Sequence, residues 1–573
     1  MASLPRRTTP GVYITELEAF PRSVVGVQTA VPAFIGYTEK AEVNSKSIAF
    51  TPVKISSLAD FTAFFGGGYH EIYNIVEVSP LIPIDGQDDD INFDFDFSCM
   101  RKSHDSTPKW EMKYYKYTRV QTVIEQKAAA PGAPTTTTQD TTTPEPSPQN
   151  VSPVKPELPK FNLYNALRLF YANGGGPCYI VSVGSYADNS TVQLNHLKKG
   201  LDAIREQSGP TMLVVPDAVL LGTSADFYTL SKYMLTQCYD LQDRVAILDV
   251  YGTNHIDQKK SDWKDEMDKL VKAFQEGVGD NFLKYGMAYF PFLVTSLVQS
   301  SEINFTNFNI ADTDQWTLLQ DILHDQADLI YGDVKAEPIE RDYIDKIPST
   351  KGSDPITKLN QNIVSAIPMF GDIQKVMALK MSLMPSSAAM AGVYTFTDST
   401  RGVWNAPANV TLTSVVEPNV QLNNDQQGVL NVPLDGKAIN VIRYFTGRGP
   451  VVWGARTLDG NSNDWRYIQV RRTLIYVEQS IEAALRPFVF AANDGKTWVA
   501  VTSMVSNFLQ GLWSQGGLMG AKADEAFTVS CGLGSTMTPM DILEGYMIVQ
   551  VTLQMIRPAE FIELTFKQKM QGL

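Results

Sequence analysis

Apolar runs alternate with amphipathic stretches along the middle of the chain, between residues 161 and 294. The short apolar runs predict strands at 178–183, 211–217, 244–250 and 286–294. Apolar positions at three-and-four spacing predict helices at 163–171, 192–206, 224–239 and 261–275. Strands separated by helices are typical of a largely parallel sheet that helices cover. The pattern therefore predicts an α/β domain over residues 161–352, for which residues 31–70 supply the start.

The pattern changes near residue 353, where the regular alternation of strands and helices ends. The elements expected after it are a helix at 373–383, a strand at 546–556, a break at Pro558 and a last strand at 560–568. We therefore expect an α+β domain over 353–545 and C-terminal strands with an arm over 546–573. A chain of 573 residues is also too long for one core, so a multidomain α/β and α+β protein is expected.

A less regular region separates the first strands from the α/β domain. Residues 71–126 are predicted to be an inserted β-rich surface region, because Phe93, Phe95 and Phe97 alternate with acids as on the two faces of a strand. The acids of this region are Asp88, Asp89, Asp90, Asp94 and Asp96. An EF-hand calcium loop needs a glycine and a glutamate at fixed offsets, so a solvated strand face is preferred over a calcium site. Residues 127–160 are rich in proline and threonine and predict an extended linker.

Both ends of the chain carry a short alternating segment without an obvious hairpin partner. Residues 1–30 are expected to form an N-terminal arm and linker strand. Because an unpaired strand edge recruits another chain, each arm is expected to complete the sheet of a neighbouring subunit. The residues expected in this strand exchange are Val12, Tyr13, Ile14, Thr15, Leu17, Phe561, Ile562, Leu564 and Phe566. The residues expected to act as hinges are Pro10, Gly11, Pro21 and Pro558.

Charge and cysteine usage limit the partners. The chain has 48 Lys and Arg against 62 Asp and Glu, a formal net charge of -14, which disfavours nucleic acid and anionic membranes. Cys99, Cys178, Cys238 and Cys531 lie far apart without a metal-binding pattern, so we expect no metal and assembly in the reducing cytoplasm. The first residues lack an apolar signal core, so no export signal is expected.

One uncharged stretch, residues 497–521, is long enough to raise the question of a membrane span. Its large apolar residues recur at helical spacing with polar residues between them: Trp498, Val501, Val505, Phe508, Leu509 and Leu512. A single apolar stripe is typical of a buried amphipathic helix, and we predict one here.

Enzyme signatures are incomplete in this sequence. The glycine-rich residues 173–177 follow a predicted helix and precede a strand, so they predict a helix end and turn; a phosphate loop has the opposite order. Residues 494–497 have the end of a P-loop motif, but Phe490 replaces its first glycine. The histidines stand alone in the sequence: His70, His104, His196, His255 and His324. We therefore expect no catalytic residue and no cofactor.

A basic cluster consists of Arg466, Arg471 and Arg472. It is interrupted by Tyr467, Ile468 and Val470, as expected for a packed element. A nucleic-acid patch is the alternative, but arginines that pair with acids on a neighbouring element are preferred.

Three blocks and both ends of the chain resemble one family. The blocks are RGVWNAPAN at 401–409, NVIRYFTGRGPVVWGARTL at 440–458 and WRYIQVRRTLIYVEQSIEAALRPFVFAAND at 465–494. Together with residues 9–41 and 526–566, they resemble the contractile tail sheath proteins of phages and related injection machines. Residues 71–160 form an insertion that departs from the family pattern.

The resemblance implies a structural role. Sheath subunits of this family stack as hexameric rings around an inner tube, joined by exchanged terminal strands, and contract from a metastable extended state to drive the tube through a target envelope. The implied partners are further copies of the chain, the inner tube protein, and baseplate and tail-terminator or cap proteins. The particle would be a phage tail or a tail-like injection system. The α/β domain would lie outward, and the C-terminal sheath polymerisation domain, completed by exchanged terminal strands, inward.

Two other functions stay open at this point. A soluble α/β enzyme would have a pocket with convergent titratable groups. An outer-surface or baseplate component of the same machine would have different terminal contacts and would not form tubes.

Overall fold

The computed structural model describes six stretches of the chain. They are residues 24–78, 95–103, 109–120, 155–189, 191–332 and 339–564. The chain divides into two compact units. Among the described residues, the sheet unit runs from Thr29 to Arg472, and the terminal unit combines residues 24–28 with residues 473–564.

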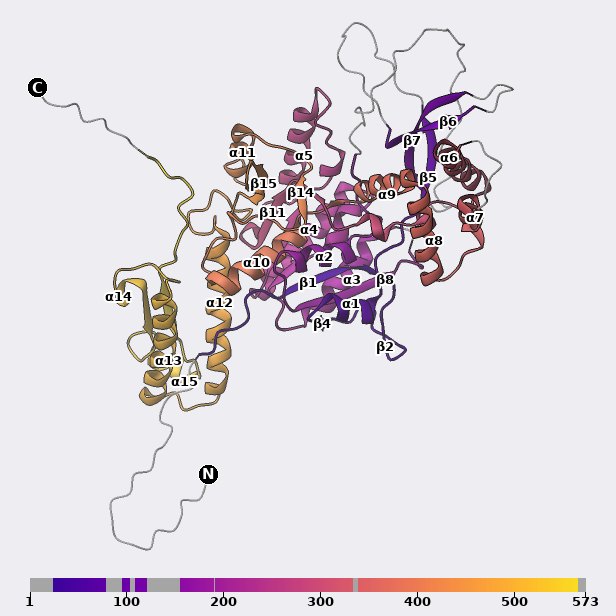
Figure 1. The fold of residues 1–573 in the computed structure, drawn as a ribbon. Helices are drawn as coiled ribbons and strands as arrows, with labels where there is room; N and C mark the ends of the chain where they lie inside the picture. Colours follow the sequence, from indigo (N-terminus) through magenta and orange to yellow (C-terminus); the bar gives the residue numbers. More distant parts are fainter. Residues whose placement is uncertain are drawn as a thin grey trace, which may run out of the picture. The chain divides into compact units, whose positions relative to one another are not determined.

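Eight strands form the main sheet of the sheet unit, in the order β16-β15-β11-β10-β9-β1-β8-β4. Figure 1 labels β1, β4, β8, β11 and β15 of this sheet. Their bounds are β1 Pro32–Thr38, β4 Val53–Ile55, β8 Cys178–Ser185, β9 Met212–Val214, β10 Val245–Asp249, β11 Gly286–Phe290, β15 Asn440–Phe445 and β16 Gly449–Val452. The six inner strands pair in parallel, and only the edge strands β16 and β4 pair antiparallel. The predicted mixed α/β fold with a largely parallel sheet is confirmed.

Helices pack around this sheet, and β9, β10 and β11 are buried along their whole length. The bounds of these helices are α1 Leu58–Phe65, α2 Leu163–Ala172, α3 Leu194–Arg205, α4 Ser224–Leu241, α5 Trp263–Gly277 and α10 Ser387–Arg401. The local sequence sets the ends of α4: the Thr223 hydroxyl accepts the Asp226 N–H at 3.1 Å, and Gln242 ends the helix with a φ of 55°. The four helices predicted between 163 and 275 are confirmed within a few residues.

Two predicted groupings differ from the structure. The strand predicted at 286–294 is divided into β11 and β12 (Leu293–Thr295), and β12 joins a separate sheet with β13 (Leu383–Met384) and β14 (Val415–Pro418). β15 and β16 belong to the main sheet, although the sequence grouping assigns their residues to the domain over 353–545. Long-range pairing decides both cases, and local periodicity carries no information about it.

A small sheet with the order β5-β7-β6 packs against helices and has a core of its own. Its strands are β5 Tyr73–Val78, β6 Phe97–Lys102 and β7 Trp110–Arg119. The helices are α6 Thr313–Tyr331, α7 Ile339–Asp345, α8 Ser353–Ala366 and α9 Pro368–Lys380. α6 supplies side chains to both edge strands of this sheet: Gln315 accepts the Ile75 N–H at 2.7 Å, and Gln326 donates to the Met100 carbonyl at 2.7 Å.

Asp96 corrects the prediction of a solvated acidic face. Its side chain is buried, lies 3.2 Å from the Lys380 ammonium and accepts the Tyr117 N–H at 2.7 Å. Asp96 precedes β6, so the alternation of that strand does not apply to it, and α9 brings a countercharge from 284 residues away. The other acids of this group and Phe93 lie outside the described residues.

The terminal unit is built on two long helices, α12 (Ile468–Leu485), which begins in the sheet unit, and α13 (Gly495–Ser514). Its shorter elements are α14 Ala523–Ala526, β17 Phe527–Ser530, α15 Pro539–Leu543 and β18 Gln550–Leu553. The buried residues of α13 are Val501, Met504, Val505, Leu509 and Leu512, which confirms the predicted amphipathic helix. Of the helices that the structure describes, none has the length and apolar character needed to cross a membrane. The remaining elements are β2 Glu42–Val43, β3 Lys46–Ser47 and α11 Asn424–Asn431.

Candidate intersubunit site

The sheet of the terminal unit has only two strands in the described part of the chain. β17 and β18 pair antiparallel from Phe527 opposite Leu553 to Ser530 opposite Gln550. Two strands alone are marginally stable in water, and a strand edge can accept another strand. The small sheet of the other unit has edges occupied by side chains of α6, so the pair β17–β18 is the better candidate for strand addition.

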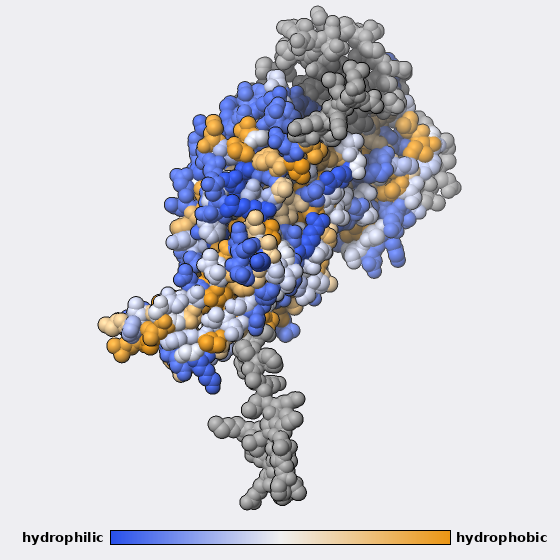
Figure 2. Space-filling view, turned by 90° about the vertical axis from the view of Figure 1, so that its left-hand side faces the viewer, coloured by the Kyte–Doolittle hydropathy of each residue, from blue (hydrophilic) through white to orange (hydrophobic). Residues whose placement is uncertain are grey.

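Large apolar side chains are exposed over much of the terminal unit. They are Val489, Phe490, Val499, Met519, Leu533, Met540, Leu543, Tyr546, Ile548, Phe561, Ile562 and Leu564. Phe490 is fully exposed and has a φ of 68°, a conformation rarely adopted by a bulky residue. Figure 2 shows apolar patches among hydrophilic residues on one face of the molecule. Exposed apolar surface of this kind marks contact sites for other proteins.

Three of the residues predicted for strand exchange are described, and all three are free of contacts that bury them. Phe561, Ile562 and Leu564 are 76%, 79% and 76% exposed. The strand predicted at 560–568 is not formed over 560–564 in the single chain, and the strand predicted at 546–556 is shortened to β18. Pro558 is half-buried and lies between β18 and the exposed residues.

The remaining predicted arm residues lie outside the described part of the chain. They are Val12, Tyr13, Ile14, Thr15, Leu17 and Phe566, with the predicted hinges Pro10, Gly11 and Pro21. Their role in strand exchange stays a prediction.

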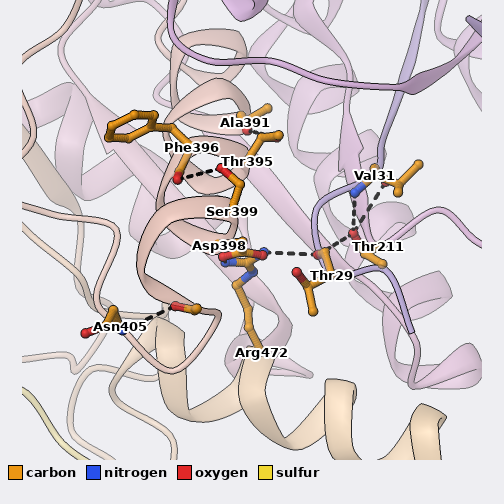
Figure 3. Close-up of polar contacts among 11 residues, drawn as sticks. Thr29, Val31, Thr211, Ala391, Thr395, Phe396, Asp398, Ser399, Asn405 and Arg472 are labelled. Carbon is orange, nitrogen blue, oxygen red and sulfur yellow. Dashed lines mark hydrogen bonds and ion pairs between the residues drawn. The ribbon is translucent and has the colours of Figure 1, made fainter. Parts of the chain in front are cut away.

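Three polar side chains, those of Arg472, Asp398 and Thr211, hold Thr29 in the sheet unit (Figure 3). We call this group the clamp. Arg472 makes a bidentate ion pair with Asp398 of α10, with nitrogen–oxygen distances of 2.8 and 2.6 Å, and both side chains are 3% exposed. The same guanidinium donates to the Thr29 carbonyl at 3.1 Å. For Arg472, this confirms the prediction that an arginine of the basic cluster pairs with an acid on a neighbouring element.

The clamp extends into the main sheet. The Thr211 hydroxyl donates to the Thr29 carbonyl at 2.7 Å and accepts the Val31 N–H at 2.9 Å. The Arg472 guanidinium also lies 4.6 Å from the centre of the Tyr394 ring. Burial lowers the pKa of Arg472, but the Asp398 carboxylate, with smaller contributions from Tyr394 and Tyr289, raises it by more, so the pKa is raised overall and the guanidinium stays charged.

The other two arginines of the cluster also pack within the protein. Arg471 is buried, with its guanidinium 4.7 Å from the Tyr285 ring centre and 5.2 Å from that of Trp465. Arg466 donates to the Ser462 carbonyl at 3.0 Å. The cluster therefore lies among internal contacts instead of forming a basic surface.

The carboxyl edge of the parallel sheet, where α/β enzymes bind ligands, is occupied by two buried carboxylates that hold the fold together. Asp217 accepts the Tyr37 N–H at 2.8 Å and the Asn162 N–H at 2.6 Å, and so ties the start of α2 to β1. Asp249 accepts the Ser387 N–H at 2.8 Å and so caps α10. Burial raises the pKa of Asp217 and of Asp249 to about 6.

A groove of about 540 Å³ lies between α5 and the segment 425–435, which contains α11 and the turn that follows it. Its lining combines apolar residues, including Val271, Leu430 and Leu434, with charged residues such as Asp268 and Asp425. The described residues contain no group of three or more metal-binding side chains. The predictions of no catalytic residue and no cofactor remain predictions.

Two sequence motifs with alternative readings have structural roles. Asn173 ends α2, and Gly174 follows with a φ of 91°, as expected for a helix end and turn. Asp494 is the N-cap of α13 and accepts the Thr497 N–H at 2.9 Å, so residues 494–497 begin a helix.

An open strand pair together with exposed apolar residues is a surface suited to association with another chain. Comparisons with known proteins agree with such a role. The profile of the phage tail sheath C-terminal domain matches residues 461–569. A putative prophage major tail sheath protein of Pseudomonas aeruginosa (strain UCBPP-PA14) is 30% identical over 141 residues, 24% of this chain and 35% of the relative. The match thus spans about a third of that relative's length.

Solved structures match over nearly the whole chain. A chain of the anti-feeding prophage helical sheath in its contracted state is 25% identical, with a TM-score of 0.54 over 98% of this chain and 100% of that one. A chain of the anti-feeding prophage baseplate is 25% identical, with a TM-score of 0.53 over 98% and 100%. A chain of the PVC sheath complex in its contracted state shares the fold, with 24% identity and a TM-score of 0.53 over 99% of each chain. The chain is thus similar to contractile tail sheath proteins, through the profile over residues 461–569 and through solved sheath chains over nearly its whole length.

Proposed function

We propose that this chain is the sheath subunit of a contractile injection machine. It polymerises as stacked rings around an inner tube in a metastable extended state, and contraction drives the tube through a target envelope. The observation that carries the proposal is the match to the contracted anti-feeding prophage sheath, which covers 98% of this chain and 100% of that one. Such a match includes both the sheet unit and the terminal unit.

The subunits are joined by exchange of terminal strands. The ladder β17–β18 has two strands in the described part of the chain, and residues 561–564 leave the unit with exposed apolar side chains. Added as a strand to the ladder of a neighbour, these residues would bury the side chains that now face solvent. The N-terminal arm, with Val12 and Ile14 on one face, is the second exchanged element.

Apolar burial has to hold each joint. A ladder hydrogen bond contributes a net of about 1 kcal/mol, whereas ordering one backbone residue costs about 1–2 kcal/mol. Burying one large apolar side chain contributes about 1.5–3 kcal/mol. Phe561, Ile562 and Leu564 together therefore supply about 5–9 kcal/mol, which exceeds the deficit left by the backbone of a short strand. Each subunit then inserts two arms into its neighbours and accepts two arms from them, so several joints must break together before a subunit dissociates.

The partners follow from this role. Copies of the chain form the rings, hexameric in the family, and the inner tube, baseplate and terminator or cap proteins complete the particle. The particle is a phage tail or a tail-like injection system assembled in the bacterial cytoplasm. Chains of both a helical sheath and a baseplate structure match this one, which supports self-assembly next to a baseplate.

Deletion of the arm tests the proposal. Removing residues 1–18 should leave soluble, folded subunits that form no tubes in negative-stain images, because one of the two exchanged elements is lost. The matched variant removes residues 560–573 and should behave in the same way. Tubes of normal length from either truncation would reject strand exchange, and the absence of tubes from the intact chain would reject the sheath.

A baseplate component is the second candidate, because a chain of the anti-feeding prophage baseplate matches this one as closely as the sheath does. Images of the purified protein separate the two roles. A sheath subunit forms long hollow cylinders, and a baseplate component stops at single rings or smaller complexes.

A further inference from the structure

The chain passes between its two units twice, at 28/29 and at 472/473. The two crossings are far apart in sequence, yet the Arg472 side chain donates to the Thr29 carbonyl at 3.1 Å. The residues that connect the units are therefore tied to each other by one guanidinium. Figure 3 shows this guanidinium between Asp398 and Thr29.

The N-terminal segment continues along one stripe of α12. Arg472, Tyr476 and Ser480 are four residues apart and so share one face of this helix. Val27 donates its N–H to the Ser480 hydroxyl at 3.1 Å. A side chain on Gly26 would collide with the Tyr476 hydroxyl, so the backbone passes directly over that ring.

We propose that Arg472 is a positioning residue for the N-terminal arm, which fixes the point where the arm leaves the subunit and transfers tension on the arm to α12 and the main sheet. The inference rests on the proposed exchange of terminal strands. A few polar contacts hold the segment 24–31 on the subunit. Without the Arg472 contact, tension from a neighbouring copy would detach this segment.

The geometry of the clamp fits this role better than a role in stability alone. A buried ion pair loses its hydration, and replacing both partners by apolar residues is often neutral for stability. Here the bidentate pair with Asp398 holds the guanidinium rigid, so that Nη2 also donates to the main-chain carbonyl of a distant segment. The second donor to that carbonyl, Thr211, begins the segment that leads into β9.

The double variant Arg472→Met/Asp398→Leu separates positioning from stability. It removes both charges together, so the expected melting temperature is that of the wild type. Hydrogen exchange at the Val27 and Val31 amides of the full chain should become about ten- to a hundredfold faster, because a hydrogen bond from a charged donor to this segment is lost. Arg472→Lys, which keeps the charge but lacks the planar fork, is the second variant and should show a smaller increase at the same amides.

The control is Arg486→Met, which removes an exposed arginine just after α12 and should leave the exchange of both amides unchanged. Unchanged exchange in the Arg472 variants, or an equal increase throughout the sheet unit, would overturn the inference. Tubes of the double variant should also break into short pieces under shear that leaves wild-type tubes intact. If the wild type forms no tubes, the proposed function fails. The hydrogen-exchange rates of the Val27 and Val31 amides still decide whether Arg472 positions the segment 24–31.

Discussion

Replacing Ile562 and Leu564 by serine tests terminal strand exchange without disturbing the fold. Their side chains are 79% and 76% exposed in the single chain, so the double variant Ile562→Ser/Leu564→Ser loses almost no contact within the subunit. In the joint, each buried aliphatic side chain contributes about 1.5–3 kcal/mol, so the variant loses about 3–6 kcal/mol. Since 1.4 kcal/mol corresponds to a factor of ten, the concentration needed for assembly rises by about a hundredfold to ten-thousandfold.

Sedimentation over a concentration series measures this effect, with negative-stain images to identify tubes and circular dichroism to confirm the fold. The matched control is Val429→Ser/Leu434→Ser, which removes two side chains that are 64% and 105% exposed in the sheet unit. The control should assemble at the wild-type concentration. Assembly of Ile562→Ser/Leu564→Ser at that same concentration would refute the reasoning.

Three further predictions concern the stability of the sheet unit. Asp217→Asn should lower the free energy of unfolding by about 2–4 kcal/mol in urea titrations, because an amide NH₂ cannot accept both buried N–H groups; an unchanged midpoint would contradict this. The pKa values of Asp217 and Asp249 are raised to about 6. Between about pH 4 and 6 the folded state therefore binds more protons than the unfolded state, so the free energy of unfolding falls as the pH rises through this window. Lowering the pH from 7.5 to 5.5 should therefore add about 1 kcal/mol per carboxylate, and a lower urea midpoint at pH 5.5 would oppose this assignment. Lys380→Met should cost about 3–5 kcal/mol by leaving Asp96 unpaired, and adding Asp96→Asn should restore part of the loss; additive losses would show that the pair is not coupled.

The regular part of the fold was predictable from sequence because local patterns determine it. Strands buried on both faces give continuous apolar runs, and α2 to α5 have the spacing of amphipathic helices, so the elements between 163 and 275 were predicted within a few residues. α13 was predicted for the same reason, from its apolar stripe.

Long-range pairing was not predictable in the same way. Asp398 and Thr29 are 74 and 443 residues from Arg472, and no local pattern distinguishes the acid or the carbonyl that the guanidinium meets. The local pattern predicts a solvated face for Asp96, and it carries no sign of the countercharge, Lys380, which a helix 284 residues later supplies. The two-stranded ladder β17–β18 was also missed as a candidate acceptor, because strand edges become visible only once the pairing is known.

The most direct measurement of the central claim is a cryo-EM map of tubes assembled from the intact chain. We predict that residues 561–566 of one copy run as a strand beside the β17–β18 ladder of a neighbour, with Ile562 and Leu564 buried between the copies. A map in which both ends of the chain fold back onto their own subunit, or in which the ladder pairs with no other copy, would contradict the account.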